Sequence, residues 1–493
     1  MKIERTKNAV RNVFFGTALK CYKMLLPFLL RTVMIYQMGI GYVGLNGLFV
    51  SVLQVLNLAE LGVGSAMVFS MYKPVAEDDT ATVCALMRLY RLYYRVIGGV
   101  IAIAGGLLTP FVPYLVRGDI PEGINLYLLY GMNLLATVLS YWLFAYKSSV
   151  FRACQRNDIP DKIMLLTSTI QYALQLAVIC IWKDYYGYVM VLLLTQALHN
   201  VLTAKASDRL YPEYTARGEL PQEQVKLLHG RIRDLLTAKI GYVVVNEADT
   251  IVISAFLGLT MLGIYQNYYL ILTSVSGFLT VIFQAVTAGI GNSLIVESKE
   301  KNLGDLRKLT RLIIWLSCCC SSCFLCLYQP FMELWVGKEC MLQDPAVILL
   351  VVYFYVLELN QLMNTYKDAA GIWHRDRFRP LVTAGANLVM NLATVQFLGV
   401  YGVLLSTVLS TLIIGMPWLV HHLFHEIFPA EECSGYIRLL LRCTAVTVVI
   451  CIVTAAIGGL IHVEGWAGLV IRLIIGLTIP NGIFFFFNKC GIV

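Results

Sequence analysis

The sequence predicts an all-α membrane protein with about fourteen transmembrane helices, and three observations lead to this fold class. The chain has 493 residues, of which 58% are hydrophobic and only 14% are charged, whereas soluble domains carry roughly 25% charged residues. The hydrophobic residues form runs of about 20, the length that a helix needs to cross the hydrocarbon core of a bilayer. The basic residues gather in alternate loops between these runs. A soluble globular domain is therefore excluded.

Fourteen apolar runs give the expected helices in chain order. Each run is long enough to cross the bilayer as a helix, and short polar loops separate the runs. The predicted spans are 11–37, 43–70, 92–116, 124–146, 162–182, 186–204, 234–257, 262–289, 309–336, 345–366, 379–398, 400–424, 437–461 and 466–488.

The charges of the loops predict the orientation of these helices. Cytoplasmic loops carry an excess of lysine and arginine. With a cytoplasmic N-terminus, the even-numbered loops hold most of the basic residues, for example in 147–162 and 299–311. The odd-numbered loops hold only Arg117, Lys183 and Lys338. Because an odd error in the number of spans would destroy this asymmetry, we expect a multi-pass protein with both termini in the cytoplasm.

Short motifs that recur at a common offset predict an internal repeat. Tyr146-Lys147 recurs as Tyr366-Lys367, 220 positions later, each time at the same end of a predicted span. Gly44 recurs as Gly263 with an offset of 219. Many transporters are built from such structural repeats. We therefore expect two six-helix lobes with the same orientation.

A third match, Tyr186 with Tyr401 after a small deletion, agrees with this repeat. Between the predicted lobes, Leu220–Leu228 has the pattern of a short amphipathic surface helix. The expected divisions are an N-terminal six-helix lobe at 1–205, a cytoplasmic linker at 206–233, a second six-helix lobe at 234–430 and two additional transmembrane helices at 431–493.

The first predicted span carries three cations, Lys20, Lys23 and Arg31. At about 100° of rotation per residue, Lys20 and Arg31 lie within about 20° of each other and Lys23 lies about 60° to one side, so the three share one face. A cation near the bilayer centre costs at least about 3 kcal/mol, and such a face normally turns toward a watery cavity. We predict that these residues bind an anionic cargo. The alternative is that their long side chains reach the nearer membrane surface.

Four acids also lie within predicted spans: Glu60, Glu247, Asp249 and Glu358. One interpretation is that they are static partners that keep the buried cations charged. The other is that they carry a proton or a sodium ion whose binding changes through a transport cycle. The sequence leaves both interpretations open, and a proton gradient, a sodium gradient or the membrane potential is the expected driving force.

Other functional classes find little support in the residue pattern. The basic residues are spread over short loops, so no nucleic-acid partner is expected. The cysteines of 318–326 and the histidines of 421–425 have spacings similar to those of metal ligands. Neither group forms a complete ligand set, so we expect neither a metal nor a cofactor. No glycine-rich phosphate loop with a following lysine occurs. The outer loops are too short to hold catalytic groups, so we expect a transporter and no enzyme.

Several motifs resemble a known family. They are Gly44–Phe49, Leu58–Ala66 and Tyr72–Pro74 in the second span, and Asp249 with Ser254, Leu262–Tyr268 and Gly289–Asn292 in the second half. The chain is similar in these motifs to the bacterial polysaccharide flippases of the multidrug, oligosaccharidyl-lipid and polysaccharide exporter superfamily. This resemblance covers almost the whole chain.

The resemblance implies two six-helix lobes that form a V around a cavity open alternately to each side of the bacterial cytoplasmic membrane. The implied cargo is an oligosaccharide linked through pyrophosphate to a polyprenyl lipid, which is moved for cell-surface polysaccharide biosynthesis. Polysaccharide biosynthesis enzymes and membrane lipids are the implied partners, and the last two helices would hold the lipid tail. Fixed cations suit a pyrophosphate, because arginine matches the geometry of phosphate oxygens.

Two alternatives belong to the same superfamily. A lipid II flippase, which moves the peptidoglycan precursor, is separated poorly from a polysaccharide flippase by sequence. A cation-coupled multidrug antiporter typically has twelve spans and an acidic or apolar cavity. The three cations of the first span and the two additional helices argue against the antiporter.

Overall fold

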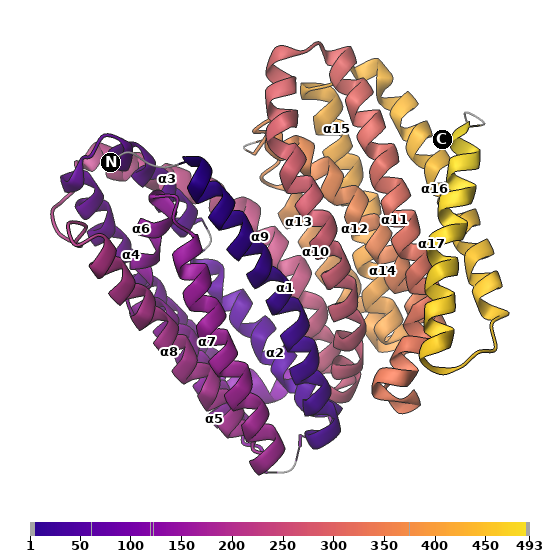
Figure 1. Ribbon diagram of the computed structural model, residues 1–493, viewed down its shortest axis with the longest axis horizontal. Helices are drawn as coiled ribbons and strands as arrows, with labels where there is room; N and C mark the ends of the chain where they lie inside the picture. Colours follow the sequence, from indigo (N-terminus) through magenta and orange to yellow (C-terminus); the bar gives the residue numbers. More distant parts are fainter. Residues whose placement is uncertain (1–4, 61, 119, 122, 374, 490–493) are drawn as a thin grey trace. The chain divides into compact units, whose positions relative to one another are not determined.

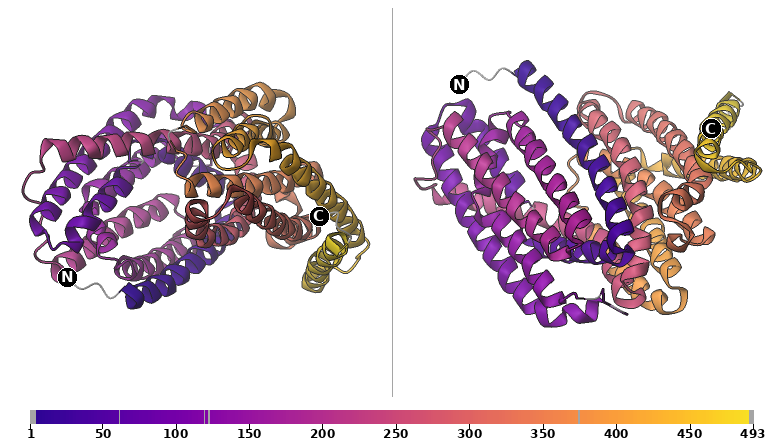
Figure 2. Two further views of the ribbon diagram at one scale, coloured as in Figure 1. Left: turned by 90° about the horizontal axis from the view of Figure 1, so that it is seen from above. Right: turned by 60° about the horizontal axis from the view of Figure 1, so that its bottom comes forward.

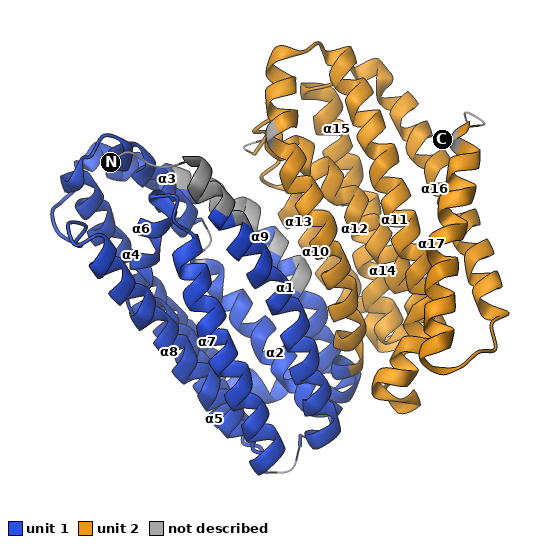
Figure 3. Cartoon of the chain, in the orientation of Figure 1, with its two compact units in different colours: residues 1–263 blue, residues 264–493 orange. Residues whose placement is uncertain are grey.

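The predicted all-α class is confirmed by a computed structural model, which describes residues 5–489 except 61, 119, 122 and 374. Helices joined by short loops make up the described chain, and no strand occurs in these residues (Figure 1). The chain divides into two compact units, residues 1–263 and residues 264–493 (Figure 3). The four-part division expected above stays a prediction.

Unit 1 is a bundle in which α1 packs on α7, α2 packs on α9, and α5 packs on both α4 and α8. The tenth helix begins at the end of this unit and continues into unit 2. The α-helices are α1 (Arg5–Met38), α2 (Ile40–Leu56), α3 (Val63–Ala76), α4 (Thr80–Leu108), α5 (Leu126–Trp142), α6 (Ser148–Ala153), α7 (Asp158–Ala177), α8 (Tyr185–Leu210), α9 (Gln222–Leu257) and α10 (Leu259–Val296). Short 3₁₀ or π segments are η1 (Asn57–Glu60), η2 (Thr109–Leu115), η3 (Ala145–Lys147) and η4 (Val178–Trp182).

Unit 2 is organised around α11, which packs against α12, α16 and α17. Both views in Figure 2 place α16 and α17, drawn in yellow, at one edge of this unit. Its helices are α11 (Lys299–Val336), η5 (Lys338–Cys340), α12 (Asp344–Ala369), α13 (Arg379–Leu398), α14 (Val400–Ser410), η6 (Thr411–Gly415), α15 (Met416–Glu426), η7 (Ala430–Glu432), α16 (Cys433–Gly459) and α17 (Gly465–Lys489).

Each of the fourteen predicted spans overlaps a helix of the structure. Within the described residues, ten helices are long and apolar enough to cross a membrane. The number is eleven if Leu126–Trp142 and Ala145–Ala153, which are bent by 47°, form one span, and Ile40–Leu56 is a shorter apolar helix. The chain therefore has the composition and helix lengths of a multi-pass membrane protein.

The structure differs from the sequence-based prediction at two helices. The predicted span 43–70 is broken: α2 ends at Leu56, η1 follows, and Gly62 has a left-handed backbone with φ of 92° before α3 begins. Glycine adopts this conformation without the steric penalty of a side chain, which allows the break. The predicted surface helix at 220–228 and the seventh span form one continuous helix, because α9 runs from Gln222 to Leu257 without a proline to stop it.

The motifs that predicted the repeat occupy similar places in the two halves of the chain. Tyr186 at the start of α8 accepts a hydrogen bond from the amide of Asn125, which caps α5, at 2.6 Å. Its counterpart Tyr401 at the start of α14 donates to Gln343, which precedes α12, at 2.6 Å. In each half, a tyrosine therefore ties the start of one helix to the start of an earlier helix.

The paired glycines Gly44 and Gly263 lie at a close crossing of α2 and α10 in unit 1. A Cβ atom on Gly44 would lie 2.0 Å from the carbonyl oxygen of Leu259, and a Cβ atom on Gly263 would lie 2.5 Å from that of Ile40. The contact is reciprocal, because Ile40 and Leu259 are separated by the same offset as the two glycines. Only glycine permits this approach of the two backbones.

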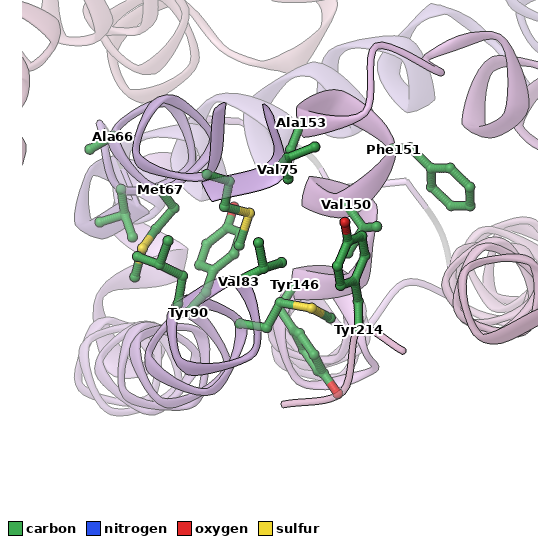
Figure 4. Close-up of a cluster of buried hydrophobic side chains, with 14 of the residues drawn as sticks. Ala66, Met67, Val75, Val83, Tyr90, Tyr146, Val150, Phe151, Ala153 and Tyr214 are labelled. Atoms are coloured by element: carbon green, nitrogen blue, oxygen red, sulfur yellow. The ribbon is translucent and has the colours of Figure 1, made fainter. Parts of the chain in front are cut away.

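A cluster of buried hydrophobic side chains joins α3, α4 and α6 (Figure 4). Met67 of α3, Val83 of α4 and Phe151 of α6 are each at most 1% exposed, and Tyr214 of the loop after α8 covers the cluster. Each large apolar side chain that is buried in this way contributes about 1.5–3 kcal/mol relative to an exposed one. The cluster therefore fixes the start of α4 and the loop after α8 against each other.

Candidate functional site

Arg31 lies on α1 beside a group of tyrosines in unit 1. Arg31 as a whole is half-buried and has Tyr188 of α8 as an electrostatic neighbour. The ring of Tyr188 stacks on Tyr185 with 5.4 Å between the centroids, and Tyr42 of α2 lies 5.2 Å from Tyr185. The buried hydroxyl of Tyr185 has no hydrogen-bond partner among the described residues. The arrangement places a cation within electrostatic range of Tyr188, whose ring belongs to a stacked group of tyrosines.

Lys23 faces polar groups of α7 and α8. Asp161 is its acidic electrostatic neighbour, and its charge also acts on His199. The imidazole of His199 lies 3.5 Å from the hydroxyl of Thr167. Lys23 and Lys20, which lies one turn before it, are both exposed on α1. The acid beside Lys23 was not foreseen from the sequence, because it lies at the start of a different span.

Glu60 ends η1, at the break between α2 and α3. Tyr94 of α4 donates a hydrogen bond to the Glu60 carboxylate at 3.1 Å, and Tyr90 donates to the Tyr94 hydroxyl at 2.6 Å. The ring of Tyr141 packs edge-to-face on Tyr94 at 5.4 Å. Gly64 leaves the space for the carboxylate, since a Cβ there would lie 3.1 Å from Glu60 Oε1. The acid thus sits in a tyrosine cage at the point where the helix is interrupted.

Glu247 and Asp249 lie on α9, where this helix packs on α2. Glu247 is half-buried and hydrogen-bonds the hydroxyl of Ser51, which is 4% exposed. Asp249 is 6% exposed. Both acids therefore belong to the interior of unit 1, on the helix that sequence analysis assigned to the second lobe.

Glu358 is the deeply buried acid of unit 2. It lies on α12 and is 2% exposed. Ser276 of α10 and Cys320 of α11 are its neighbours. Among the residues with described side chains, no lysine or arginine forms an ion pair with it. Burial of a charged carboxylate without a cation is costly, so we expect the Glu358 carboxyl group to hold a proton or to bind a cation.

Two further buried hydroxyls lie on α11, the helix that carries Cys320, a neighbour of Glu358. Ser317 and Ser321 are one turn apart on α11, and their buried hydroxyls have no hydrogen-bond partner among the described residues. They share a helix face with Phe324, which packs edge-to-face on Phe354 of α12, one turn before Glu358. A carboxylate with nearby hydroxyl oxygens is the type of ligand set that hard cations such as sodium prefer. Histidine, cysteine and acidic residues do not form a metal-binding group of three in the described part of the chain.

Two buried aspartates that sequence analysis missed hold the loops after the repeated Tyr-Lys motifs. Asp158 is fully buried and pairs with Arg156 at 2.9 Å and Lys162 at 3.1 Å. Asp376 accepts two hydrogen bonds from Arg379, each of 2.7 Å. In both halves a buried acid therefore anchors a loop through a basic neighbour within four residues.

The fold of this chain is shared with known membrane transporters and flippases, as comparison with solved structures shows. No protein-family model and no curated protein sequence matches the chain. Solved structures of transporters and flippases of the MOP superfamily do match it. Sequence identities are low, so this likeness establishes that the chain has the fold of these membrane proteins.

Three of the solved structures are particularly informative. The lipid II flippase MurJ, in an inward closed conformation, superposes with a TM-score of 0.65 and 13% identity, over 97% of this chain and 99% of that chain. An inward-facing multidrug resistance MATE family transporter gives a TM-score of 0.62 and 13% identity, over 86% of this chain and 95% of that chain. A point mutant of the Vibrio cholerae MATE transporter VcmN gives a TM-score of 0.56 and 16% identity, over 84% of this chain and 96% of that chain. The MurJ likeness thus extends over nearly the full length of both chains.

Proposed function

We propose that this chain is a flippase of the bacterial cytoplasmic membrane that moves a polyprenyl-pyrophosphate-linked oligosaccharide by alternating access for cell-surface polysaccharide biosynthesis. The low-identity likeness to MOP transporters supports the fold on which this mechanism depends. Membrane lipids and polysaccharide biosynthesis enzymes are the proposed partners. The driving force is a proton gradient, a sodium gradient or the membrane potential.

The observation that carries the proposal is the position of Arg31 beside the tyrosines of unit 1. A guanidinium group donates paired, charge-assisted hydrogen bonds to phosphate oxygens. Tyrosine rings offer apolar faces to sugar rings and a hydroxyl to their polar groups. Lys20 and Lys23 on the same face of α1 add positive charge for a pyrophosphate.

Two neighbouring cavities on α11, α16 and α17 of unit 2 are consistent with a lipid-linked cargo. A cavity of about 700 Å³ between α11 and α17 is lined by Lys308, Arg311 and Trp315, together with residues of α17 that include Gly482. Gly482 also lines an apolar groove of about 480 Å³ between α16 and α17. Cations at one site and apolar surface at the next suit a phosphate followed by an isoprenoid tail.

Glu358 is the proposed coupling residue, since a buried carboxyl without an ion pair is able to exchange a proton or a cation during the cycle. Glu60 and Glu247 are less deeply buried than Glu358, and their carboxylates are hydrogen-bonded to Tyr94 and Ser51. We therefore assign these two acids to charge balance within unit 1, together with Asp249.

A second candidate function is transport of lipid II, the cargo named for the MurJ structure that matches nearly the full chain. Its pyrophosphate would contact the same cations, so the two functions differ in the sugar that is recognised. A cation-coupled multidrug antiporter is the third candidate, because MATE structures share the fold. The cations of α1 disfavour a cationic drug in this part of unit 1.

The experiment measures translocation by the full chain in proteoliposomes, under imposed proton and sodium gradients. The cargoes are a pyrophosphate-linked oligosaccharide lipid, lipid II and a small cationic drug. Parallel vesicles contain Arg31→Gln, Arg31→Lys and the matched control Lys205→Gln, which removes an exposed cation of α8. We expect transport of the oligosaccharide lipid by the parent and the control, at least tenfold slower transport by Arg31→Gln, and partial recovery with Arg31→Lys.

The outcomes separate the candidate functions. Transport of lipid II alone would replace the proposed cargo, and efflux of the drug alone would place the chain with the antiporters. Undiminished transport by Arg31→Gln at equal abundance would remove Arg31 from the cargo site. Loss of the gradient dependence in Glu358→Gln, with cargo binding retained, would support its coupling role.

A further inference from the structure

The first half of α4 carries a basic cavity that the proposed transport mechanism does not use. The cavity has a volume of about 450 Å³, within the range of ligand-binding pockets. Arg88, Arg91 and Arg95 of α4 line one side, and Ala216 and Gly218–Leu220 of the loop between α8 and α9 line the other. Because α4 and this loop are held together by the buried cluster of Figure 4, the cavity is part of the folded unit.

The charges of the cavity are only partly balanced. Arg88 donates a hydrogen bond to the carbonyl oxygen of Gly218 at 2.9 Å and to the Glu219 carboxylate at 3.1 Å. Arg91 and Arg95 form no salt bridge and no side-chain hydrogen bond within the described parts of the chain. Three arginines against one glutamate leave two positive charges in the lining. Such a cavity attracts an anion.

The cavity opens at the end of a lipid-facing surface. Leu92 lines the cavity and begins a stripe of exposed apolar residues along α4. This stripe continues through Val96, Val100, Ile103 and Leu107, with exposed fractions between 48% and 70%. Residues at this spacing share one helix face. Acyl chains that lie along the stripe would bring their headgroup to the arginines.

Trp142 marks the level of the membrane surface next to the cavity. Its side chain is 50% exposed, and its indole nitrogen donates a hydrogen bond to the carbonyl oxygen of Arg95 at 3.1 Å. Tryptophan is enriched at the level of lipid headgroups. The guanidinium groups of Arg91 and Arg95 are therefore placed where phosphates of the bilayer lie.

We propose that this cavity binds an anionic phospholipid of the cytoplasmic leaflet through its phosphate. Arg91 and Arg95 donate charge-assisted hydrogen bonds to the phosphate oxygens, and the acyl chains cover the apolar stripe of α4. The phosphate competes with Glu219 for Arg88. Since Glu219 belongs to the loop that leads into α9, an occupied cavity weakens the ion pair that ties this loop to α4. This site is separate from the cations of α1 and does not depend on the proposed cargo.

The experiment titrates the full chain in detergent micelles with dioleoylphosphatidylglycerol and counts the retained lipid by native mass spectrometry. Zwitterionic dioleoylphosphatidylcholine is the lipid control. We expect Arg91→Gln/Arg95→Gln to weaken binding of the anionic lipid at least tenfold, and Glu219→Gln to strengthen it several-fold, because the competing carboxylate is removed. The matched control Lys205→Gln/Arg209→Gln removes two exposed cations of α8 and should bind like the parent.

Equal retention of the two lipids, or unchanged binding by Arg91→Gln/Arg95→Gln, would overturn the proposal. Inorganic phosphate and glycerophosphoglycerol are tested as competitors. If either competes as strongly as the intact lipid, the cavity binds a soluble anion instead. If the double variant fails to fold, a photoactivatable phosphatidylglycerol is crosslinked to the parent, and adducts outside 85–95 and 216–225 would overturn the assignment.

Discussion

Replacing Asp376 by asparagine tests how strongly a buried ion pair stabilises unit 2. The carboxylate is 2% exposed and accepts two hydrogen bonds of 2.7 Å from Arg379, and the Lys367 amine lies 3.6 Å away. Asparagine preserves the size of the side chain but removes its charge. Arg379, which is 5% exposed, then remains as a buried cation without its main partner.

The expected loss is about 3–5 kcal/mol of unfolding free energy, the usual cost of removing one partner of a buried pair. A simple electrostatic calculation agrees, because two unit charges about 4 Å apart interact by about 4 kcal/mol at an effective dielectric constant of about 20. The hydrogen bond from Arg379 to Asn364, at 2.9 Å, persists and places the expected value near the lower end of this range.

The assay is unfolding in mixed micelles by titration with a denaturing detergent, followed by circular dichroism. The matched control is Glu333→Gln, which breaks the exposed pair with Lys338 at 3.1 Å and should cost less than about 1 kcal/mol. The double variant Asp376→Asn/Arg379→Gln should lose less than the sum of the two single variants, since the pair is lost only once. A cost for Asp376→Asn as small as that of the control would refute the reasoning.

Three further predictions concern unit 1. Gly263→Ala should lower the midpoint of thermal unfolding by the equivalent of about 1–3 kcal/mol, because its Cβ would lie 2.5 Å from the carbonyl oxygen of Ile40; an unchanged midpoint would contradict the close crossing. Tyr94→Phe removes the 3.1 Å hydrogen bond to Glu60, and detergent unfolding should show a loss of about 1–3 kcal/mol; parent-like stability would mean that the cage does not hold the acid. Burial raises the pKa of the Cys154 thiol to about 11, and its side chain is 1% exposed. At pH 8 this thiol therefore stays protonated and should react with a maleimide only after denaturation, as mass spectrometry of the labelled peptide would show.

Helix positions were largely predictable from the sequence, because the bilayer imposes a simple length and polarity rule. The break near Glu60 was not predictable in this way, since Leu58–Ala66 is apolar enough to continue a helix. The backbone conformation of Gly62, and the tyrosines that receive the carboxylate, decide that the helix stops. A lone acid inside an apolar run, followed by glycines, was the available signal.

The candidate site was predictable as a set of residues but not as a set of contacts. A buried charge is conspicuous in an apolar run, so Arg31 and Glu358 were identified without a structure. Their surroundings come from distant parts of the chain. Arg31 lies on α1 and its neighbour Tyr188 on α8, whereas Glu358 lies on α12 and its neighbour Ser276 on α10. The roles of these charges in cargo binding and coupling stay predictions.

By itself, the sequence determined the all-α class, the approximate ends of the helices and the internal offset that pairs Gly44 with Gly263. These properties follow from local composition and from the requirement that backbone polar groups in a bilayer be satisfied within helices. Only the tertiary structure decided which buried charges have partners, where two backbones touch and where arginines of α4 meet an interhelical loop to form a cavity. Such features depend on side chains that are far apart in sequence and become neighbours only when the helices pack.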